Sequence, residues 1–116
     1  MNKFKNSLTL DQRIKKSELI KIKHPTLIPV IIEKYSNNKA PDLDRNKYLI
    51  TKDSQFNVLA NLIRNSIKLD KSKALFFYTN NKLINQADLM SVLYNNHKDK
   101  DGFLYIEYAY ENTFGN

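Results

Sequence analysis

The sequence predicts a single α+β domain in which one mixed β-sheet wraps around one long helix, preceded by two additional helices. Three observations predict this class. A chain of 116 residues, 41% apolar and 27% charged, is large enough for one domain with a real core. Short β-rich runs are separated by polar turns, and one long segment between them has helical periodicity. No internal repeat or second domain is apparent.

The first quarter of the chain predicts two helices. Residues 1–8 favour a short, marginal helix. Thr9 then provides an N-cap for a second helix, because Gln12 three residues later completes a capping box. One face of this helix carries Ile14, Ser17 and Ile20. Pro25 ends it, because the residue before a proline is pushed out of the α region.

The next segment predicts a β-hairpin. Residues 27–34 are rich in β-branched residues, and Pro29 lies near the start, where a missing N–H is tolerated. Residues 36–46 form a polar loop, and residues 47–51 form the partner strand.

The long helix begins after a cap at Asp53 or Ser54 and runs to about Ile67. Its apolar positions are Phe56, Leu59, Leu62, Ile63 and Ile67. Their spacing places them on one helical face.

The rest of the chain predicts two more strands, a short helix and a brief strand extension. The predicted elements are a strand at 73–79, a turn at Asn80-Asn81, a brief strand at 83–84, a helix at 89–94, a turn at Asp101-Gly102 and a strand at 103–108. After the two N-terminal helices, the order ββαββ is that of the ubiquitin-like β-grasp. The expected organisation is a helical extension at 1–24, the β-grasp domain at 25–110 and a flexible C-terminal tail at 111–116.

The composition excludes several kinds of chemistry. The chain has no cysteine, so it has no disulfide, thiolate metal site or cysteine nucleophile. His24 and His97 lack a metal-ligand spacing, and Asp42 and Asp44 are interpreted as loop-forming residues. The two glycines do not form a phosphate-binding loop. We therefore expect a protein that is not an enzyme and that has no cofactor and no metal.

The chain has a formal net charge of +7, and it is unevenly placed. Residues 1–25 contain seven basic side chains, namely Lys3, Lys5, Arg13, Lys15, Lys16, Lys21 and Lys23, against Asp11 and Glu18. A basic balance suits acidic protein segments, anionic membranes or nucleic acid. For this face we favour acidic segments or an anionic membrane, and we expect no nucleic-acid partner. No apolar run follows residues 1–5, so we expect no secretory signal, and no apolar run of the sequence is long enough to span a bilayer.

Two sequence features suggest binding surfaces. Phe76, Phe77 and Tyr78 suggest either base stacking on a sheet or core packing, and we favour the core for Phe77. If residues 47–51 form an edge strand, a partner peptide can add to it as a further strand, and Arg45 and Lys47 favour acidic flanks on that peptide.

The C-terminus ends in Phe114-Gly115-Asn116, and Gly115 is one of two glycines in the chain. Glycine has no Cβ, so its backbone can enter a narrow catalytic groove. This suggests a tail that is trimmed and then joined to another molecule, although glycines near a terminus often have no function.

Taken together, the chain resembles the GABARAP family, the autophagy-related protein 8 family of ubiquitin-like modifiers, over nearly its full length. The matching residues are Ile28-Pro29-Val30-Ile31-Ile32-Glu33-Lys34, Asp42-Leu43-Asp44-Arg45-Asn46-Lys47-Tyr48-Leu49, Leu62-Ile63-Arg64, Ala74-Leu75-Phe76-Phe77, Asn80-Asn81, Leu93-Tyr94, Lys98-Asp99-Lys100-Asp101-Gly102-Phe103-Leu104-Tyr105 and Glu111-Asn112-Thr113-Phe114-Gly115. The last two blocks are specific to the family.

The resemblance implies a conjugation mechanism. A cysteine protease would cleave between Gly115 and Asn116. Activating and conjugating enzymes would then transfer the Gly115 carboxylate to the amine of phosphatidylethanolamine, whose two acyl chains anchor the protein. The expected location is cytoplasmic, and on the autophagosomal membrane when the chain is lipidated.

The resemblance also implies binding of autophagy receptors through aromatic-x-x-aliphatic peptides. The aromatic pocket would be lined by Ile20, Pro29, Ile31, Lys47, Leu49 and Phe103. The aliphatic pocket would be lined by Tyr48, Ile50, Leu59 and Leu62. Alternation along the strand sends Lys47 and Leu49 to one side and Tyr48 and Ile50 to the other.

Several residues depart from the usual family pattern. They are Lys16, Leu27, Ser54, Asn57, Ser66 and Asn85-Gln86. Leu27 and Ser66 replace common arginines, which removes charge-assisted partners for acidic peptide residues. We therefore expect an altered partner preference with intact tail chemistry. The alternatives are a non-conjugated peptide-binding scaffold and a basic nucleic-acid-binding module, for which Gly115 would not be needed.

Overall fold

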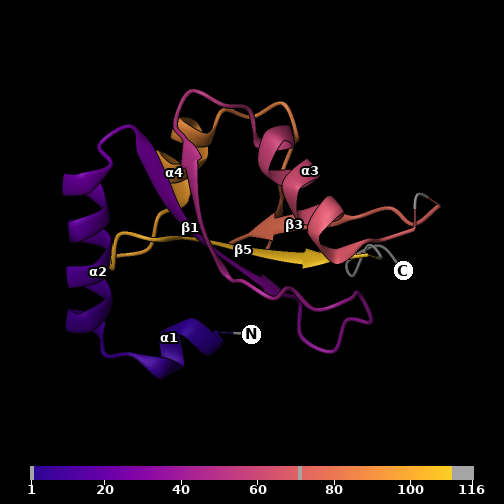
Figure 1. The fold of residues 1–116 in the computed structure, drawn as a ribbon, viewed down its shortest axis with the longest axis horizontal. Helices are drawn as coiled ribbons and strands as arrows, with labels where there is room; N and C mark the ends of the chain where they lie inside the picture. Colours follow the sequence, from indigo (N-terminus) through magenta and orange to yellow (C-terminus); the bar gives the residue numbers. More distant parts are fainter. Residues whose placement is uncertain (1, 71, 111–116) are drawn as a thin grey trace.

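The structure is a computed structural model that describes residues 2–70 and 72–110 (Figure 1). The elements within these residues are α1 (Lys3–Ser7), α2 (Leu10–Lys23), β1 (Leu27–Lys34), β2 (Lys47–Thr51), α3 (Phe56–Ile67), β3 (Phe76–Thr79), β4 (Lys82–Leu83), α4 (Met90–His97) and β5 (Leu104–Ala109). The predicted α+β class and the predicted order of elements are confirmed.

The five strands form one mixed sheet in the order β2-β1-β5-β3-β4. The predicted hairpin is confirmed, because β1 pairs antiparallel with β2, with Leu27 opposite Thr51 and Ile31 opposite Lys47. On its other side β1 runs parallel to β5, and β5 pairs antiparallel with β3. This arrangement leaves β2 at one edge of the sheet.

The main hydrophobic core lies between the sheet and the helices α3 and α4 (Figure 1). Phe56 on α3 meets Phe77 on β3 edge to face, with ring centroids 5.0 Å apart. Val30 and Ile32 of β1 point into this core. Because successive strand residues point to opposite faces, Ile31 belongs to a separate cluster on the other side of the sheet.

Helices α1 and α2 pack against that opposite face of the sheet. The smaller cluster there consists of Phe4, Ile31 and Phe103, with Ile20 packed against it. The predicted capping box of α2 is confirmed: Gln12 N donates to Thr9 Oγ1 at 3.2 Å, and Thr9 N donates to Gln12 Oε1 at 2.9 Å. A local sequence signal therefore determines where α2 begins.

The predicted side-chain cap of α3 at Asp53 or Ser54 is wrong. The N-cap residue is Gln55, and it makes no side-chain capping bond. The first backbone N–H groups are satisfied instead by a distant segment: Phe56 N donates to Asp88 O at 2.7 Å, and Asn57 N donates to Gln86 O at 2.9 Å. A tertiary contact thus replaces the local cap, because any suitable acceptor satisfies these donors.

Two strand boundaries differ from prediction for reasons of pairing. Strand β3 begins at Phe76, because Phe76 pairs with Ala109, the last residue of β5. Strand β5 begins at Leu104, because both backbone groups of Phe103 bond within the preceding turn, N to Asp101 Oδ1 and O to Asp99 N.

The predicted turn at Asn80-Asn81 is confirmed, with both φ angles positive at 49° and 63°. Two asparagines with positive φ suit the right-handed twist of a two-residue hairpin. The brief strand β4 covers Lys82–Leu83, and α4 continues to His97, three residues beyond the predicted end.

Candidate functional site

The free edge of β2 is the candidate binding site. In the described part of the chain, β2 has a strand neighbour on one side only, which is β1. An edge strand presents unpaired N–H and C=O groups that can pair with an added peptide strand. Arg45 is exposed beside the start of the strand, and Lys47 is half-buried. These two cations favour a peptide with acidic residues.

The α3 side of this edge contains a cavity of about 790 Å³. It is lined by Leu43, Asp44, Arg45, Lys47, Tyr48, Leu49, Leu62 and Ser66. Tyr48 and Leu62, both expected in the aliphatic pocket, line it. Ile50 and Leu59, expected there too, are 6% and 0% exposed and lie in the main core. These two side chains pack beneath the surface and are almost inaccessible to a ligand.

The lining of the cavity combines aliphatic and polar side chains. Leu62 is 48% exposed and Leu49 is 39% exposed, so two aliphatic side chains are accessible at the edge. Burial raises the pKa of the Tyr48 hydroxyl above its ordinary value. Such a site suits an aliphatic side chain carried on an extended backbone.

The α2 side of the edge holds the residues expected in the aromatic pocket. Ile20 is half-buried, whereas Ile31 and Phe103 are 1% and 0% exposed. Pro29 is buried on β1, and Lys47 and Leu49 lie at the edge and also line the α3-side cavity. The six residues therefore comprise a buried floor and a more accessible rim.

Phe4 of α1 covers part of that floor, which sequence analysis did not predict. Its ring meets the ring of Phe103 edge to face, with centroids 5.1 Å apart, and it clusters with Ile31. The available signal was a lone aromatic between Lys3 and Lys5 in an otherwise polar segment. Residue spacing alone cannot identify a partner so distant in the chain.

Two polar contacts hold α1 in place. Phe4 N donates to Glu33 Oε2 at 2.9 Å, and Lys5 Nζ pairs with Asp99 Oδ1 at 2.8 Å. Although burial raises the pKa of the Asp99 carboxyl, hydrogen bonds from Lys5 and from the Asp101 backbone outweigh it and lower the pKa below 3.8. Lys5 also lies over the Tyr105 ring, 4.5 Å from its centroid.

A buried ionic cluster fixes α2 against β5. Arg13 Nη1 pairs with Asp101 Oδ2 at 2.7 Å, and the Asp101 side chain is 0% exposed. Tyr105 OH donates to the same carboxylate, and Ser17 Oγ donates to Asp101 O. This cluster sets the position of α2, and therefore of Ile20 at the aromatic pocket.

Gly102 allows the close approach of α2. Its φ is +92°, and a Cβ there would lie 2.4 Å from Ser17 Oγ. Any side chain at this position would force α2 away from the sheet, so the predicted turn at Asp101-Gly102 also serves packing.

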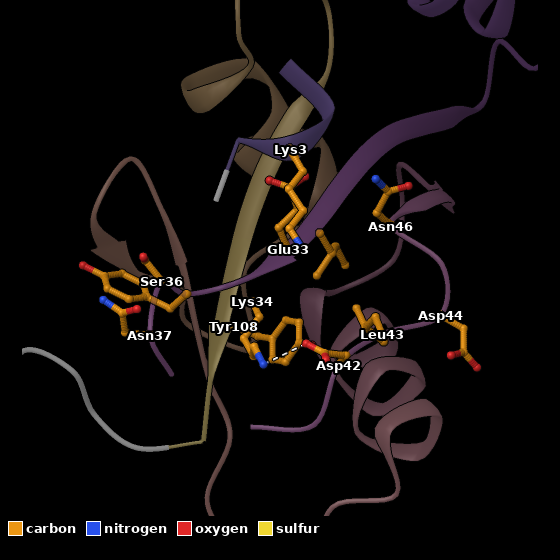
Figure 2. A pocket seen from close by; sticks show the side chains of 12 residues that line it. Lys3, Glu33, Lys34, Ser36, Asn37, Asp42, Leu43, Asp44, Asn46 and Tyr108 are labelled. Atoms are coloured by element: carbon orange, nitrogen blue, oxygen red, sulfur yellow. Dashed lines mark ion pairs between the residues drawn. The ribbon is translucent and has the colours of Figure 1, made fainter. Parts of the chain in front are cut away.

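A second cavity, of about 650 Å³, lies beside the loop that leads into β2 (Figure 2). Polar contacts around this cavity hold the loop. Lys34 Nζ pairs with Asp42 Oδ1 at 2.7 Å and also donates to Ala40 O at 3.1 Å. Tyr108 OH donates to Pro41 O at 2.7 Å. Asp42 is thus a loop-fixing residue, as its place in the sequence predicts.

Gly115 and Asn116, on which the expected conjugation depends, lie outside the described residues. The point of departure of the tail is defined: β5 ends at Ala109, and Tyr110 N donates to Asn38 Oδ1 at 3.2 Å. The tail therefore follows a strand that lies between β1 and β3 inside the sheet.

Other kinds of site find little support in the described residues. Phe77 and Tyr78 are 3% and 1% exposed, so these rings are not available for base stacking. No group of three or more potential metal ligands is present in that part of the chain. Within the same residues, none of the helices combines the length and apolar character that crossing a bilayer requires.

Comparison with known proteins gives consistent matches. Residues 12–115 match the family model described as "Autophagy protein Atg8 ubiquitin like". The chain is 46% identical over 112 residues to autophagy-related protein 8h of Arabidopsis thaliana, covering 97% of this chain and 94% of that protein. It is 43% identical to autophagy-related protein 8 of Mycosarcoma maydis, covering 97% and 95%.

A solved structure also resembles the fold. The crystal structure of Trypanosoma brucei ATG8 superposes with a TM-score of 0.88 at 34% identity, covering 92% of each chain. The likeness therefore extends over both the sequence and the arrangement of the elements.

Proposed function

Because the chain belongs to the Atg8 family of ubiquitin-like autophagy proteins, we propose that it is a modifier conjugated through Gly115 to phosphatidylethanolamine. Conjugation would allow it to recruit receptors to the autophagosomal membrane. In this proposal residues 1–24 form a helical extension, residues 25–110 the ubiquitin-like domain and residues 111–116 the conjugation tail. The unlipidated form is cytoplasmic.

The tail would be processed in three stages: cleavage, activation and conjugation. A cysteine protease hydrolyses the Gly115–Asn116 peptide bond with one water and releases asparagine. An activating enzyme uses ATP to adenylate the Gly115 carboxylate, releasing pyrophosphate, and captures it as a thioester, releasing AMP. A conjugating enzyme takes the acyl group by thiol–thioester exchange, which frees the activating enzyme's thiol. It then passes the acyl group to the lipid amine, which forms an amide and frees its own thiol. The chain itself contributes a substrate and no catalytic group.

Receptor binding uses the free edge of β2, and this edge is the observation that best supports the proposal. An extended peptide would pair with the strand. Its aliphatic side chain would enter the α3-side cavity against Tyr48 and Leu62. Its aromatic side chain would pack on the α2 side against Ile20 and Leu49. Main-chain pairing gives affinity, and the two side-chain positions give specificity.

The departures from the family pattern affect the flanks of this site. Ser66 lines the α3-side cavity, and its Oγ donates to Leu62 O at 2.8 Å instead of presenting a cation. We expect a weaker preference for acidic flanking residues than relatives with arginine there. An array of peptides with acidic and neutral flanks measures this, and an unaltered preference contradicts it.

Substitution of the terminal glycine tests conjugation. Gly115→Ala should leave the thermal midpoint unchanged and abolish recovery of the protein in the membrane fraction of starved cells. Asn116→Gln is the matched control, because the residue after the cleaved bond is discarded, and this variant should still be conjugated. Unchanged membrane recovery of Gly115→Ala would contradict the proposal.

A further inference from the structure

The outer face of α2 combines exposed apolar residues with lysines. Ser17 points inward and is buried, whereas Leu19 and Ile22 are 51% and 77% exposed. Residues three apart are neighbours on a helix surface, so these two side chains lie together. None of the cavities described above is lined by either residue. In Figure 1, α2 is the outermost element at the left of the molecule, with its outer side uncovered.

Three lysines and one acid, Glu18, border this pair. Lys15 and Lys23 lie one turn before and one turn after Leu19, and Lys16 lies three residues before it. All three are exposed. Among the described residues, the cations in ion pairs within 4.0 Å are Lys5, Arg13 and Lys34, so these three lysines have no such pair. The acids on this helix are Asp11 and Glu18.

These features suit a lipid surface better than a protein groove. The face is a helix side with a small apolar centre that Lys15, Lys16 and Lys23 border, together with one acid, Glu18, as in helices that lie in a membrane interface. An anionic leaflet attracts such lysines, and two aliphatic side chains can enter the headgroup region. We propose that the outer face of α2 binds anionic bilayers, with Leu19 and Ile22 inserted and Lys15, Lys16 and Lys23 against the lipid phosphates.

This contact does not depend on the proposed conjugation. Strand β5 ends on the opposite side of the molecule from α2 (Figure 1), and none of the residues in the face belongs to the tail. The full-length, unconjugated protein is therefore the right material for a test. A failure of lipid binding would leave the conjugation proposal untouched, and the reverse also holds.

Co-sedimentation with vesicles tests the proposal. One set contains phosphatidylcholine alone, and the other has one lipid in three replaced by phosphatidylserine. The protein should bind the anionic vesicles and not the neutral ones. Leu19→Ser with Ile22→Ser should weaken binding about tenfold through lost apolar burial. Lys15→Glu with Lys23→Glu should weaken it at least about fivefold for each lysine.

A matched control removes apolar surface elsewhere. Leu83 and Val92 are 58% and 47% exposed and lie on β4 and α4. Leu83→Ser with Val92→Ser should leave vesicle binding unchanged. Equal loss in both apolar pairs, no loss in the α2 pair, or equal binding to neutral vesicles would each overturn the proposal. Capture of soluble polyglutamate without vesicle binding would also overturn it, in favour of an acidic protein partner.

A fluorescence measurement reports insertion directly. The chain contains no tryptophan, so Ile22→Trp introduces a single probe in the centre of the face. Its emission should shift to the blue with anionic vesicles and stay unchanged with neutral ones. No shift with anionic vesicles would contradict insertion, even if the lysines held the protein at the surface.

Discussion

At the scale of single residues, Asp101 does the most to organise the face that carries α2. Its fully buried carboxylate accepts from Arg13, from Tyr105 and from the backbone N–H of Phe103. A buried charge is tolerated only when it is paired and hydrogen-bonded, and removal of one partner leaves the other charge uncompensated. One side chain therefore links a helix near the N-terminus to the last strand.

Neutralising this carboxylate should destabilise the protein. Asp101→Asn should lower the free energy of unfolding by about 3 kcal/mol, because it removes the nearer anion of Arg13, at 2.7 Å, and leaves only Asp99 at 4.0 Å. Urea denaturation measures this. The control is Asp42→Asn, which breaks the pair with Lys34, where the Asp42 side chain is 83% exposed. This control should change stability little. Equal losses in both variants would show that burial of the ion pair is unimportant.

Glu107 has the opposite effect on stability. It lies opposite Glu33 in the parallel pairing of β1 and β5, and its Oε2 is buried without a hydrogen-bond partner. Burial, and to a lesser extent the Glu33 carboxylate, raise the pKa of Glu107 above 4.5. The ionised form is therefore less favourable in the folded state than in the unfolded state.

Replacing Glu107 with glutamine should stabilise the protein at neutral pH. As pH rises above 4.5, the unfolded carboxyl ionises first and wild-type stability falls, until the raised folded pKa is passed. Glutamine does not ionise, so the thermal midpoint of Glu107→Gln should exceed that of wild type at pH 7. The difference should disappear below pH 4.5. A difference that persists at low pH would assign the effect to packing.

At the scale of elements, α1 is held mainly by one side chain. Phe4 supplies the apolar contact, and the helix has only five residues. Phe4→Ala should release α1 from the domain. Loss of a buried phenylalanine costs about 3 kcal/mol, and a five-residue helix is not stable without tertiary contacts.

Hydrogen exchange measures this release. The amides of residues 4–7 should lose protection in Phe4→Ala, while those of β1 and β5 keep theirs. Asn6→Ala is the control, because Asn6 lies exposed on the same helix. Protection of residues 4–7 that survives Phe4→Ala would mean that the Lys5–Asp99 ion pair alone holds the helix.

The α3-side cavity allows a matched test on a single helix. Leu62 and Val58 are 48% and 45% exposed on α3, but of these two only Leu62 lines the cavity. Leu62→Ser should weaken binding of an aromatic-x-x-aliphatic peptide about fivefold, through lost apolar contact. Val58→Ser should have no effect. Calorimetry measures both, and similar losses would contradict the placement of the aliphatic side chain.

At the scale of the whole molecule, sequence patterns predicted most of the fold. The capping box of Thr9 and Gln12 and the turn at Asn80-Asn81 are local signals, and each was found as predicted. The edge position of β2 was only a condition at the level of sequence, and the strand order of the sheet shows it. The cap of α3 was missed, because its acceptors come from residues 86 and 88, and no local pattern encodes such a partner.

The candidate site was less predictable than the fold for the same physical reason. Alternation places Lys47 and Leu49 on one face of β2 and Tyr48 and Ile50 on the other, yet Lys47, Tyr48 and Leu49 all line the α3-side cavity. Alternation also does not tell how deeply each side chain is buried. Ile50 and Leu59 lie in the core because α3 covers that face of the sheet. Phe4 covers the opposite cluster through a contact between the two ends of the chain. Both facts depend on tertiary packing.

The measurement that most directly tests the central claim is the intact mass of the protein from its own starved cells, in soluble and membrane fractions. We predict that the soluble pool has lost Asn116, and that the membrane pool has gained the mass of a phosphatidylethanolamine on Gly115. Full-length mass in both pools would contradict conjugation and would leave a peptide-binding scaffold with an unused tail.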